Sequence, residues 1–363
     1  MFISWGIIQS AVELGLIYSM VALALFLSYS MLNVCDLSTD GCYTLGCSVG
    51  SMVALTGHPV LALLAAIGSG VCSGFVTAFL QTRMKIESLL AGIIVNTGLY
   101  TINIMILGKA TVSLNDAPTV FTWMKKVLAG TPLADCYKLV VALCFVILTV
   151  LFLVLFLRTR LGLSIRATGN NKDMVRSSSL NPTTMITIGL CCSNAITALG
   201  GCLIGEYNKT CDINMGTGMV TIALASLIIG ETIFGKKTVP WRAVGVVIGA
   251  VIYRIVVAIA LRLNMPATAL KLVSAVIVAV AISYPTVVRA LALQNRRLSA
   301  RGISLYRILQ AAFAALTVLF VLLSVFTSGS RPLMILLALL CAVFLILMIT
   351  ADRKERRDAH AGA

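Results

Sequence analysis

Long apolar runs alternate with short polar stretches along the whole chain, and this pattern predicts membrane-spanning helices. A helix needs about 20 apolar residues to cross the hydrocarbon core of a bilayer. Eleven runs have a suitable composition, and they are Trp5–Leu32, Gly41–Thr56, Val60–Leu80, Leu89–Leu107, Leu139–Leu157, Met185–Ile204, Gly218–Phe234, Ala243–Leu261, Ala267–Val288, Ile308–Phe326 and Leu333–Thr350. The predicted fold class is all-α, a polytopic transmembrane helix bundle.

The second run, Gly41–Thr56, is short and rich in Gly, Ser and Cys. This composition predicts a half-span that begins inside the membrane, where broken backbone is tolerated only if it faces protein or a water-filled cavity. Counted without it, the other runs make ten crossings, and both termini lie on the same side.

Charged residues are scarce and unevenly distributed. They make up 11% of the 363 residues, with 28 Lys and Arg against 13 Asp and Glu, a formal net charge of +15. Soluble domains carry about 25% charged residues, so the composition excludes a soluble enzyme and a disordered chain. With ten crossings, 19 of the 28 basic residues fall on one side. Basic loops stay in the cytoplasm, which predicts two cytoplasmic termini in the cell (inner or plasma) membrane.

Two short polar stretches share a pattern, and each follows a helix that is expected to run outward. Cys35–Gly41 and Cys211–Gly216 both contain Cys-Asp, an aliphatic residue and a nearby Gly, and both lead into a Gly-rich apolar run. Their matched places predict a two-fold internal repeat. Such breaks are typical of residues that line a transport path, although two surface turns with cap residues would look alike. The candidate pathway residues are Asp36, Asp40, Gly41, Asp212 and Asn214.

Other polar residues lie inside the apolar runs. Asn96 and Asn103 share one helical face and would either line a path or bond a neighbouring helix. Glu13, Glu231 and Arg254 are intramembrane charges, each costing at least ~2.5–3.5 kcal/mol at mid-bilayer. They should therefore be paired. The sequence allows either a Glu13–Arg254 or a Glu231–Arg254 ion pair and does not choose between them. A proton or ion relay is the alternative, which would make the protein a secondary transporter.

The chain has no recognisable catalytic apparatus. Gly230–Lys237 nearly matches a phosphate-binding loop, but Lys237 stands where Ser or Thr must bind magnesium. Most of the eleven Cys lie in apolar runs, where Cys packs as a small hydrophobe, and no Cys/His spacing resembles a zinc site. We predict no enzyme activity, no cofactor and no metal.

The longest polar stretch in the middle of the chain is Arg158–Asn181. Asn171 can cap a short helix over Lys172–Ser178, and Asn181-Pro182 would end it. That helix would present its apolar residues to a cleft on a soluble partner, whereas a basic loop held by lipid headgroups is the alternative. The candidate docking residues are Asn171, Lys172, Asp173, Met174, Val175, Arg176 and Ser177.

Several motifs resemble those of one transporter family. Arg166–Ser177 is similar to the coupling region of ABC-importer permeases. Asp36–Gly46 resembles the motif Asp-Leu-Thr-x-Asp-Gly-Ser-x-x-Leu-Gly of the branched-chain amino acid and ribose-type permeases, in particular their tryptophan/tyrosine transport subgroup. Further similar stretches follow in order at Leu89–Ile93, Leu99–Asn103, Ile106–Lys109, Asp212–Gly216, Ile228–Glu231, Tyr253–Arg254 and Leu270–Leu272. Ser178-Ser179-Leu180 departs from the family pattern, so the docking helix would end or pack differently.

The resemblance implies the permease subunit of an ATP-driven ABC importer for a small, amino-acid-like solute, and the subgroup adds aromatic amino acids. It implies cytoplasmic ABC ATPase subunits on the docking loop, an extracellular solute-binding (lipo)protein and a second permease chain, as a homodimer or a pseudo-dimer. Gly108–Lys138, with Pro118, Trp123 and Pro132, is the outer loop expected to receive the binding protein. The alternatives are an ion-coupled secondary transporter or channel-like protein, a structural or lipid-binding subunit, and an ABC permease for sugars or nucleosides. Nucleic acid is not an expected partner.

The expected domains follow the resemblance, which covers residues 5–290. A permease core, 1–290, consists of repeat halves 1–157 and 183–290 joined by the docking loop 158–182. Residues 291–350 add a two-helix extension that the family core lacks, and 351–363 form a basic cytoplasmic tail.

Overall fold

The computed structural model describes residues 5–115, 117–129, 136–235 and 238–262. The chain divides into two compact units, Met1–Ile255 and Val256–Ala363, and the contacts described below all belong to the first unit. The predicted spans after residue 262, the extension 291–350 and the tail 351–363 lie outside the described residues, as do Lys236, Lys237 and Pro132.

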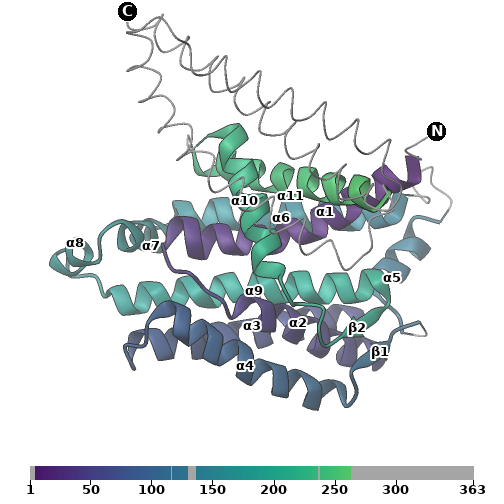
Figure 1. Ribbon diagram of the computed structural model, residues 1–363, viewed down its shortest axis with the longest axis horizontal. Helices are drawn as coiled ribbons and strands as arrows, with labels where there is room; N and C mark the ends of the chain where they lie inside the picture. The colour runs from purple at the N-terminus through teal and green to yellow at the C-terminus, as the bar shows by residue number, and fades with distance from the viewer. Residues whose placement is uncertain (1–4, 116, 130–135, 236–237, 263–363) are drawn as a thin grey trace, which may run out of the picture. The chain divides into compact units, whose positions relative to one another are not determined.

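Helices dominate the described residues, as the apolar runs predict (Figure 1). They are α1 (Trp5–Leu25), which continues as the π-helical turn η1 (Phe26–Met31), α2 (Thr39–Leu55), α3 (Pro59–Thr82), α4 (Ser88–Leu107), α5 (Val120–Val127), α6 (Tyr137–Arg158), α7 (Arg160–Asn170), α8 (Lys172–Ser177), α9 (Pro182–Asn208), α10 (Met219–Phe234) and α11 (Val239–Arg262). Two short strands, β1 (Thr111–Ser113) and β2 (Thr210–Asp212), pair antiparallel.

Six of these helical stretches are long and apolar enough to cross a membrane. They are Gly6–Met31, Pro59–Thr82, Ser88–Leu107, Tyr137–Arg158, Pro182–Asn208 and Val239–Ile259. An all-α membrane bundle is therefore confirmed for the described part of the chain. The predicted runs at 41–56 and 218–234 form the shorter helices α2, of 17 residues, and α10, of 16 residues.

The central helix is α9, which packs against α1, α2 and α3 (Figure 1). Gly70 and Gly74 of α3 and Gly46 of α2 all lie directly against the α9 backbone, where an added Cβ would overlap main-chain atoms. Small residues allow this close approach in membrane bundles, where lipid supplies no hydrophobic force between helices.

We name the two ends of the bundle by what lies there. The loop end carries α7 and α8, and the end that we call the hairpin end carries the antiparallel pair β1 and β2, two strands that lie far apart in the chain (Figure 1). α1 starts at the hairpin end, where Gln9 Nε2 donates to Cys136 Sγ (3.8 Å) just before α6. It leads to the loop end, where Gly169 of α7 lies against the Met31 carbonyl. The prediction that the start of the first helix and the loop 158–182 share one side is therefore wrong.

The reason lies in the segment between α1 and α3. After η1 the chain turns back into the bundle, and α2 then runs parallel to α9, with Gly50 beside Cys202, toward the hairpin end. Gly41–Thr56 does begin within the bundle, but together with residues 32–38 before it this run returns the chain to the hairpin end. The prediction gave it no crossing of its own.

The two Cys-Asp breaks also follow helices of opposite direction. α1 and α9 are antiparallel: Glu13, early in α1, bonds Tyr207 at the end of α9, and Leu32, just after η1, packs near Ile186 at the start of α9. The expectation that both breaks follow outward-running helices is therefore wrong.

Candidate functional site

Two short helices begin inside the bundle, and their first turns meet. Asp40 lies in the first turn of α2, where its Oδ2 accepts from Gly218 N (2.9 Å) and its Oδ1 from Val220 N (2.8 Å). The N-cap of α10 is Gly218, at φ +86°, and it has no side chain to cap the helix. Asp40 therefore supplies the cap from another helix, and its negative charge faces the positive end of the α10 dipole. We call residues 40–44 with 216–220 the half-helix junction.

The half-helix junction is tightly packed. Gly216 N donates to Thr44 Oγ1 (3.1 Å), and a Cβ at residue 216 would overlap the Asp40 carbonyl and the Thr44 hydroxyl. Gly216, Gly218 and Thr44 were not among the residues chosen from the sequence. The signal that could have found them is the Gly216-x-Gly218 pair immediately before an apolar run.

Asp36 ties the break before α2 to α9. It is 1% exposed, and its carboxylate accepts from Ser38 N (2.9 Å), Ser38 Oγ (2.6 Å) and Asn194 Nδ2 (2.8 Å). Three donors satisfy the charge, which is what burial of a carboxylate requires. Asp36 therefore orients the entry into α2 more than it offers an open binding group.

The two Asn residues on α4 both face α2. Asn103 Nδ2 donates to the Gly41 carbonyl (3.2 Å), and a Cβ at Gly41 would lie 2.7 Å from Asn96 Oδ1. Of the two alternatives for this pair, the contact of Asn103 favours bonding to a neighbouring helix. Gly41 is required there because α4 approaches its backbone so closely.

Asp212 and Asn214 lie apart from the half-helix junction. Asp212 Oδ2 accepts from Thr111 Oγ1 (2.9 Å) on β1, and its Oδ1 accepts from Asn214 N (2.7 Å). Asn214 itself is exposed. The sequence pattern made these residues equivalent to Asp36 and Asp40, but the structure places Asp212 beside β1, where its carboxylate also fixes the turn that follows β2.

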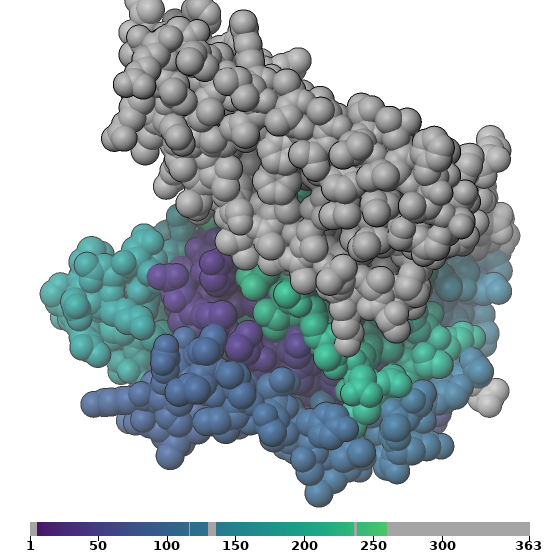
Figure 2. Space-filling view, viewed as in Figure 1, coloured from purple at the N-terminus to yellow at the C-terminus, as the bar shows by residue number. Residues whose placement is uncertain are grey.

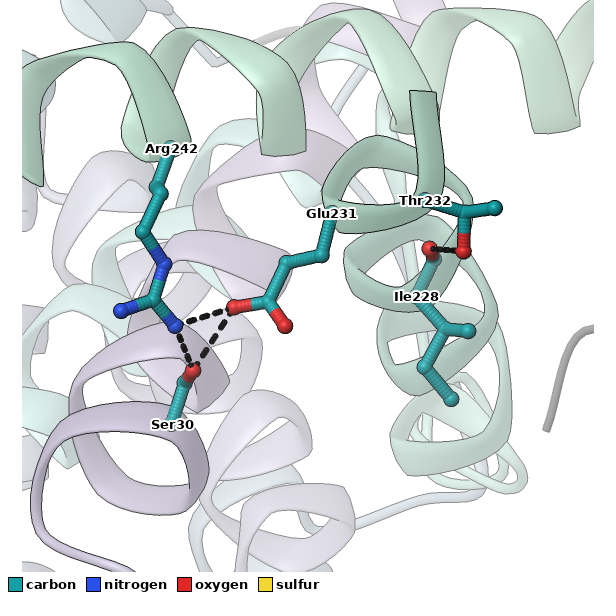
Figure 3. Close-up of polar contacts among 5 residues, drawn as sticks. All are labelled: Ser30, Ile228, Glu231, Thr232 and Arg242. Atoms are coloured by element: carbon teal, nitrogen blue, oxygen red, sulfur yellow. Dashed lines mark hydrogen bonds and ion pairs between the residues drawn. The ribbon is translucent and has the colours of Figure 1, made fainter. Parts of the chain in front are cut away.

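Glu231 is paired with Arg242, which lies just outside the predicted apolar runs. It forms an ion pair with Arg242 of α11, and Ser30 of η1 donates to its Oε1 (2.7 Å) (Figure 3). Arg242 also bonds Ser30, so the three side chains tie η1, α10 and α11 together. Figure 3 shows Thr232, one residue on, turned away to donate to the Ile228 carbonyl (2.7 Å).

Glu13 and Arg254 lie against different partners. Glu13 is 4% exposed and accepts from Gln9 Nε2 (3.0 Å) and the Tyr207 hydroxyl (2.8 Å). The Arg254 guanidinium lies over the Tyr18 ring, 3.9 Å from its centroid, a cation–π geometry. Within the described residues, neither the Glu13–Arg254 nor the Glu231–Arg254 ion pair forms.

The loop 158–182 folds as α7 and α8, which project at the loop end as a separate lobe (Figure 2). Asn171 Oδ1 accepts from Asp173 N (3.0 Å) and Met174 N (3.1 Å), so the predicted cap is confirmed. Met174 is 54% exposed, whereas Val175 is 1% exposed. Of the two apolar side chains of the docking helix, only Met174 is exposed, and the prediction that Val175 points outward with it is wrong. The remaining docking residues, Lys172, Asp173, Arg176 and Ser177, are exposed.

Comparison with known proteins identifies the class to which this bundle belongs. The family model described as the permease component of branched-chain amino acid transport systems matches residues 7–282. The chain belongs to this permease family, and it is a multi-pass membrane component of a transport system, not an enzyme. Permeases of this family work with ATPases and solute-binding proteins.

Two individual relatives match most of the chain. It is 35% identical over 274 residues to a tyrosine transport system permease protein of Clostridioides difficile, covering 75% of this chain and 89% of that protein. It is 31% identical over 284 residues to an uncharacterized protein of Rickettsia prowazekii, covering 77% of this chain and 97% of that protein.

Proposed function

We propose that the chain is the permease subunit of an ATP-driven ABC importer for an amino-acid-like solute, with aromatic amino acids as the first candidates. The observation that carries this is membership of the permease family together with a relative named as a tyrosine transport permease. The chain has no phosphate-binding loop of its own, so ATP hydrolysis belongs to partner subunits. A homodimer of permease chains completes the importer.

Uptake of labelled tyrosine tests the substrate class. Cells that express the chain with its partners should accumulate tyrosine, and unlabelled phenylalanine and tryptophan should compete while ribose should not. Competition by ribose or a nucleoside, with no effect of aromatic amino acids, would reassign the substrate class.

The ATPase-docking proposal rests on α8. Its cap fixes a short exposed helix at the loop end, and Met174 is the apolar side chain that this helix offers to a partner. Met174→Asp should abolish co-purification of the ATPase, because a charge would be buried in an apolar cleft. Met84→Asp is the matched control, since Met84 is 59% exposed in the turn after α3. Normal ATPase recovery with Met174→Asp would reject the assignment.

A series of direct contacts supports a coupling route from α8 to the half-helix junction. α8 follows α7, Gly169 of α7 lies against the Met31 carbonyl of η1, and the neighbouring Ser30 bonds Glu231 and Arg242. α10 then leads from Glu231 back to Gly218 at the junction. Movement of α8 by the ATPases would shift α10 relative to α2 and open a path between them toward the cytoplasm.

The directions of the helices support a revised topology in which the loop end is cytoplasmic and the first helix starts outside. All eleven apolar runs then cross, the C-terminus remains cytoplasmic, and the same 19 of 28 basic residues stay inside. The α1–α2 and α9–α10 pairs become an inverted repeat. In intact cells, antibody should reach a tag before Met1 but not one after Ala363; the reverse pattern would reject this topology.

The outer loop supports docking of the binding protein at α5. Thr119 and Thr122 form a capping box, and the buried Glu206 carboxylate of α9 accepts from Val120 N (2.8 Å). The fixed helix leaves Trp123 56% exposed. Trp123→Ala should weaken binding of the solute-loaded binding protein at least 5-fold, because exposed Trp side chains are common binding anchors. Unchanged affinity would exclude α5 from that interface.

A further inference from the structure

Two thiols from separate elements meet beside the half-helix junction. Cys47 lies on α2 and Cys211 on β2, both are 0% exposed, and neither is in a disulfide. They share one buried cluster with Leu107 and Val112.

Polar groups and sulfur surround the pair. Ser48 Oγ lies 4.0 Å from Cys211 Sγ, Ser51 Oγ lies 4.0 Å from Cys47 Sγ, and Met215 Sδ lies 3.7 Å from Cys47 Sγ. The pKa of the Cys211 thiol lies below its usual value, chiefly because the neighbouring Cys47 side chain stabilises its charged form, while burial acts in the opposite direction. The thiolate is the reactive form of cysteine, so Cys211 is the better nucleophile of the two.

We propose that Cys47 and Cys211 form a reversible disulfide that locks the half-helix junction, with an extracytoplasmic disulfide compound as oxidant. The Cys211 thiolate attacks one sulfur of the oxidant, forming a mixed disulfide and releasing the first thiolate. The Cys47 thiol then loses its proton and attacks the Cys211 sulfur, which expels the second thiolate. The two protein thiols lose two electrons and two protons, and the oxidant is reduced to two thiols.

The position of this bond explains its effect. Cys47 lies one turn beyond Thr44 of α2, and Cys211 lies on the chain that leads to Gly216 and α10. A covalent link there would hold α2 against the segment before α10, so the two first turns could not separate. The hairpin end faces the outside in the proposed topology, where disulfides persist, and this compartment assignment rests on the proposed function.

The sulfurs are buried, so an oxidant reaches them when the junction opens. The disulfide should therefore form faster during ATP-driven turnover than at rest. This also explains how a closed molecule can hold both residues as free thiols.

The test uses the complete importer in membrane vesicles, oxidised with glutathione disulfide as the probe. Mass spectrometry of the unreduced digest should find a peptide linking Cys47 and Cys211, and solute uptake should fall at least 5-fold and recover with dithiothreitol. Cys47→Ser and Cys211→Ser should each keep uptake under oxidation. Cys72→Ser and Cys144→Ser, which change exposed thiols on other helices, should remain as sensitive as the wild type.

The wild-type digest alone decides whether the bond forms, so a variant that fails to fold does not obscure the result. Absence of the linked peptide after prolonged oxidation, or a linked protein with undiminished uptake, would overturn the proposal. Lack of uptake by the reduced wild type would instead contradict the proposed function, whatever the digest shows.

Discussion

Replacing Asp40 with Asn tests the half-helix junction with little change in shape. The carboxylate accepts two backbone N–H bonds at the start of α10. The Asn amide keeps one acceptor oxygen and turns an NH2 group toward the other N–H, so one charge-assisted bond is lost. A bond to a charged group contributes about 1.5–3 kcal/mol, and the lost charge at a helix N-terminus adds about 0.3–1 kcal/mol. The free energy of local opening should therefore fall by about 3 kcal/mol, or on the order of 100-fold.

Hydrogen–deuterium exchange in lipid nanodiscs measures that opening directly. The amides of residues 216–222 should exchange on the order of 100-fold faster in Asp40→Asn than in the wild type. Asp212→Asn is the matched control, since Asp212 also accepts a backbone N–H but lies at the hairpin, and it should leave residues 216–222 unchanged. Unchanged exchange in Asp40→Asn, or equal effects of the two variants, would contradict the role of Asp40 as the cap of α10.

Three further substitutions probe other contacts. Arg242→Met should destabilise the protein by about 3 kcal/mol, because the Glu231 carboxylate, with its side chain 12% exposed, loses its ion pair with Arg242. Arg176→Met should change thermal unfolding little, since its bridge to Asp173 is 4.0 Å long and exposed. Equal losses of stability in the two variants would show that the Glu231–Arg242 pair contributes no more than an exposed ion pair. Gly216→Ala should lower the yield of folded protein, because the new Cβ would overlap Asp40 and Thr44. Gly98→Ala is the control and should be tolerated, since its Cβ position has open space. A stable Gly216→Ala protein would show that α2 and the segment before α10 can move apart to make room. Asn171→Ala removes the α8 cap, which contributes about 0.5–2 kcal/mol, so ATPase affinity should fall several-fold, and full affinity would mean that the partner itself orders the helix.

The sequence predicted the features that depend on local composition. Apolar runs located the helices, and Asn171 located the cap of α8, because a membrane span and an N-cap are each encoded within a few turns of chain. The breaks beside Asp36 and Asp212 were also visible, since Asp, Asn and Gly interrupt otherwise apolar runs.

The features that the sequence missed depend on which helices become neighbours. Arg242 looked like a loop cation, and only the packing of α11 against η1 brings it to Glu231. Val175 lies beside Met174 in the chain, but α8 buries it. Charge counting misplaced the start of the first helix relative to the loop 158–182. It gives the same inner loops for ten crossings that start inside and for eleven that start outside.

Solute uptake by proteoliposomes that contain this chain, its ATPases and its binding protein tests the central claim most directly. The solute should accumulate against its gradient only with ATP on the loop-end side, and this accumulation should persist with an ionophore present and disappear with Met174→Asp. Accumulation driven by an ion gradient without ATP, and unaffected by Met174→Asp, would contradict it.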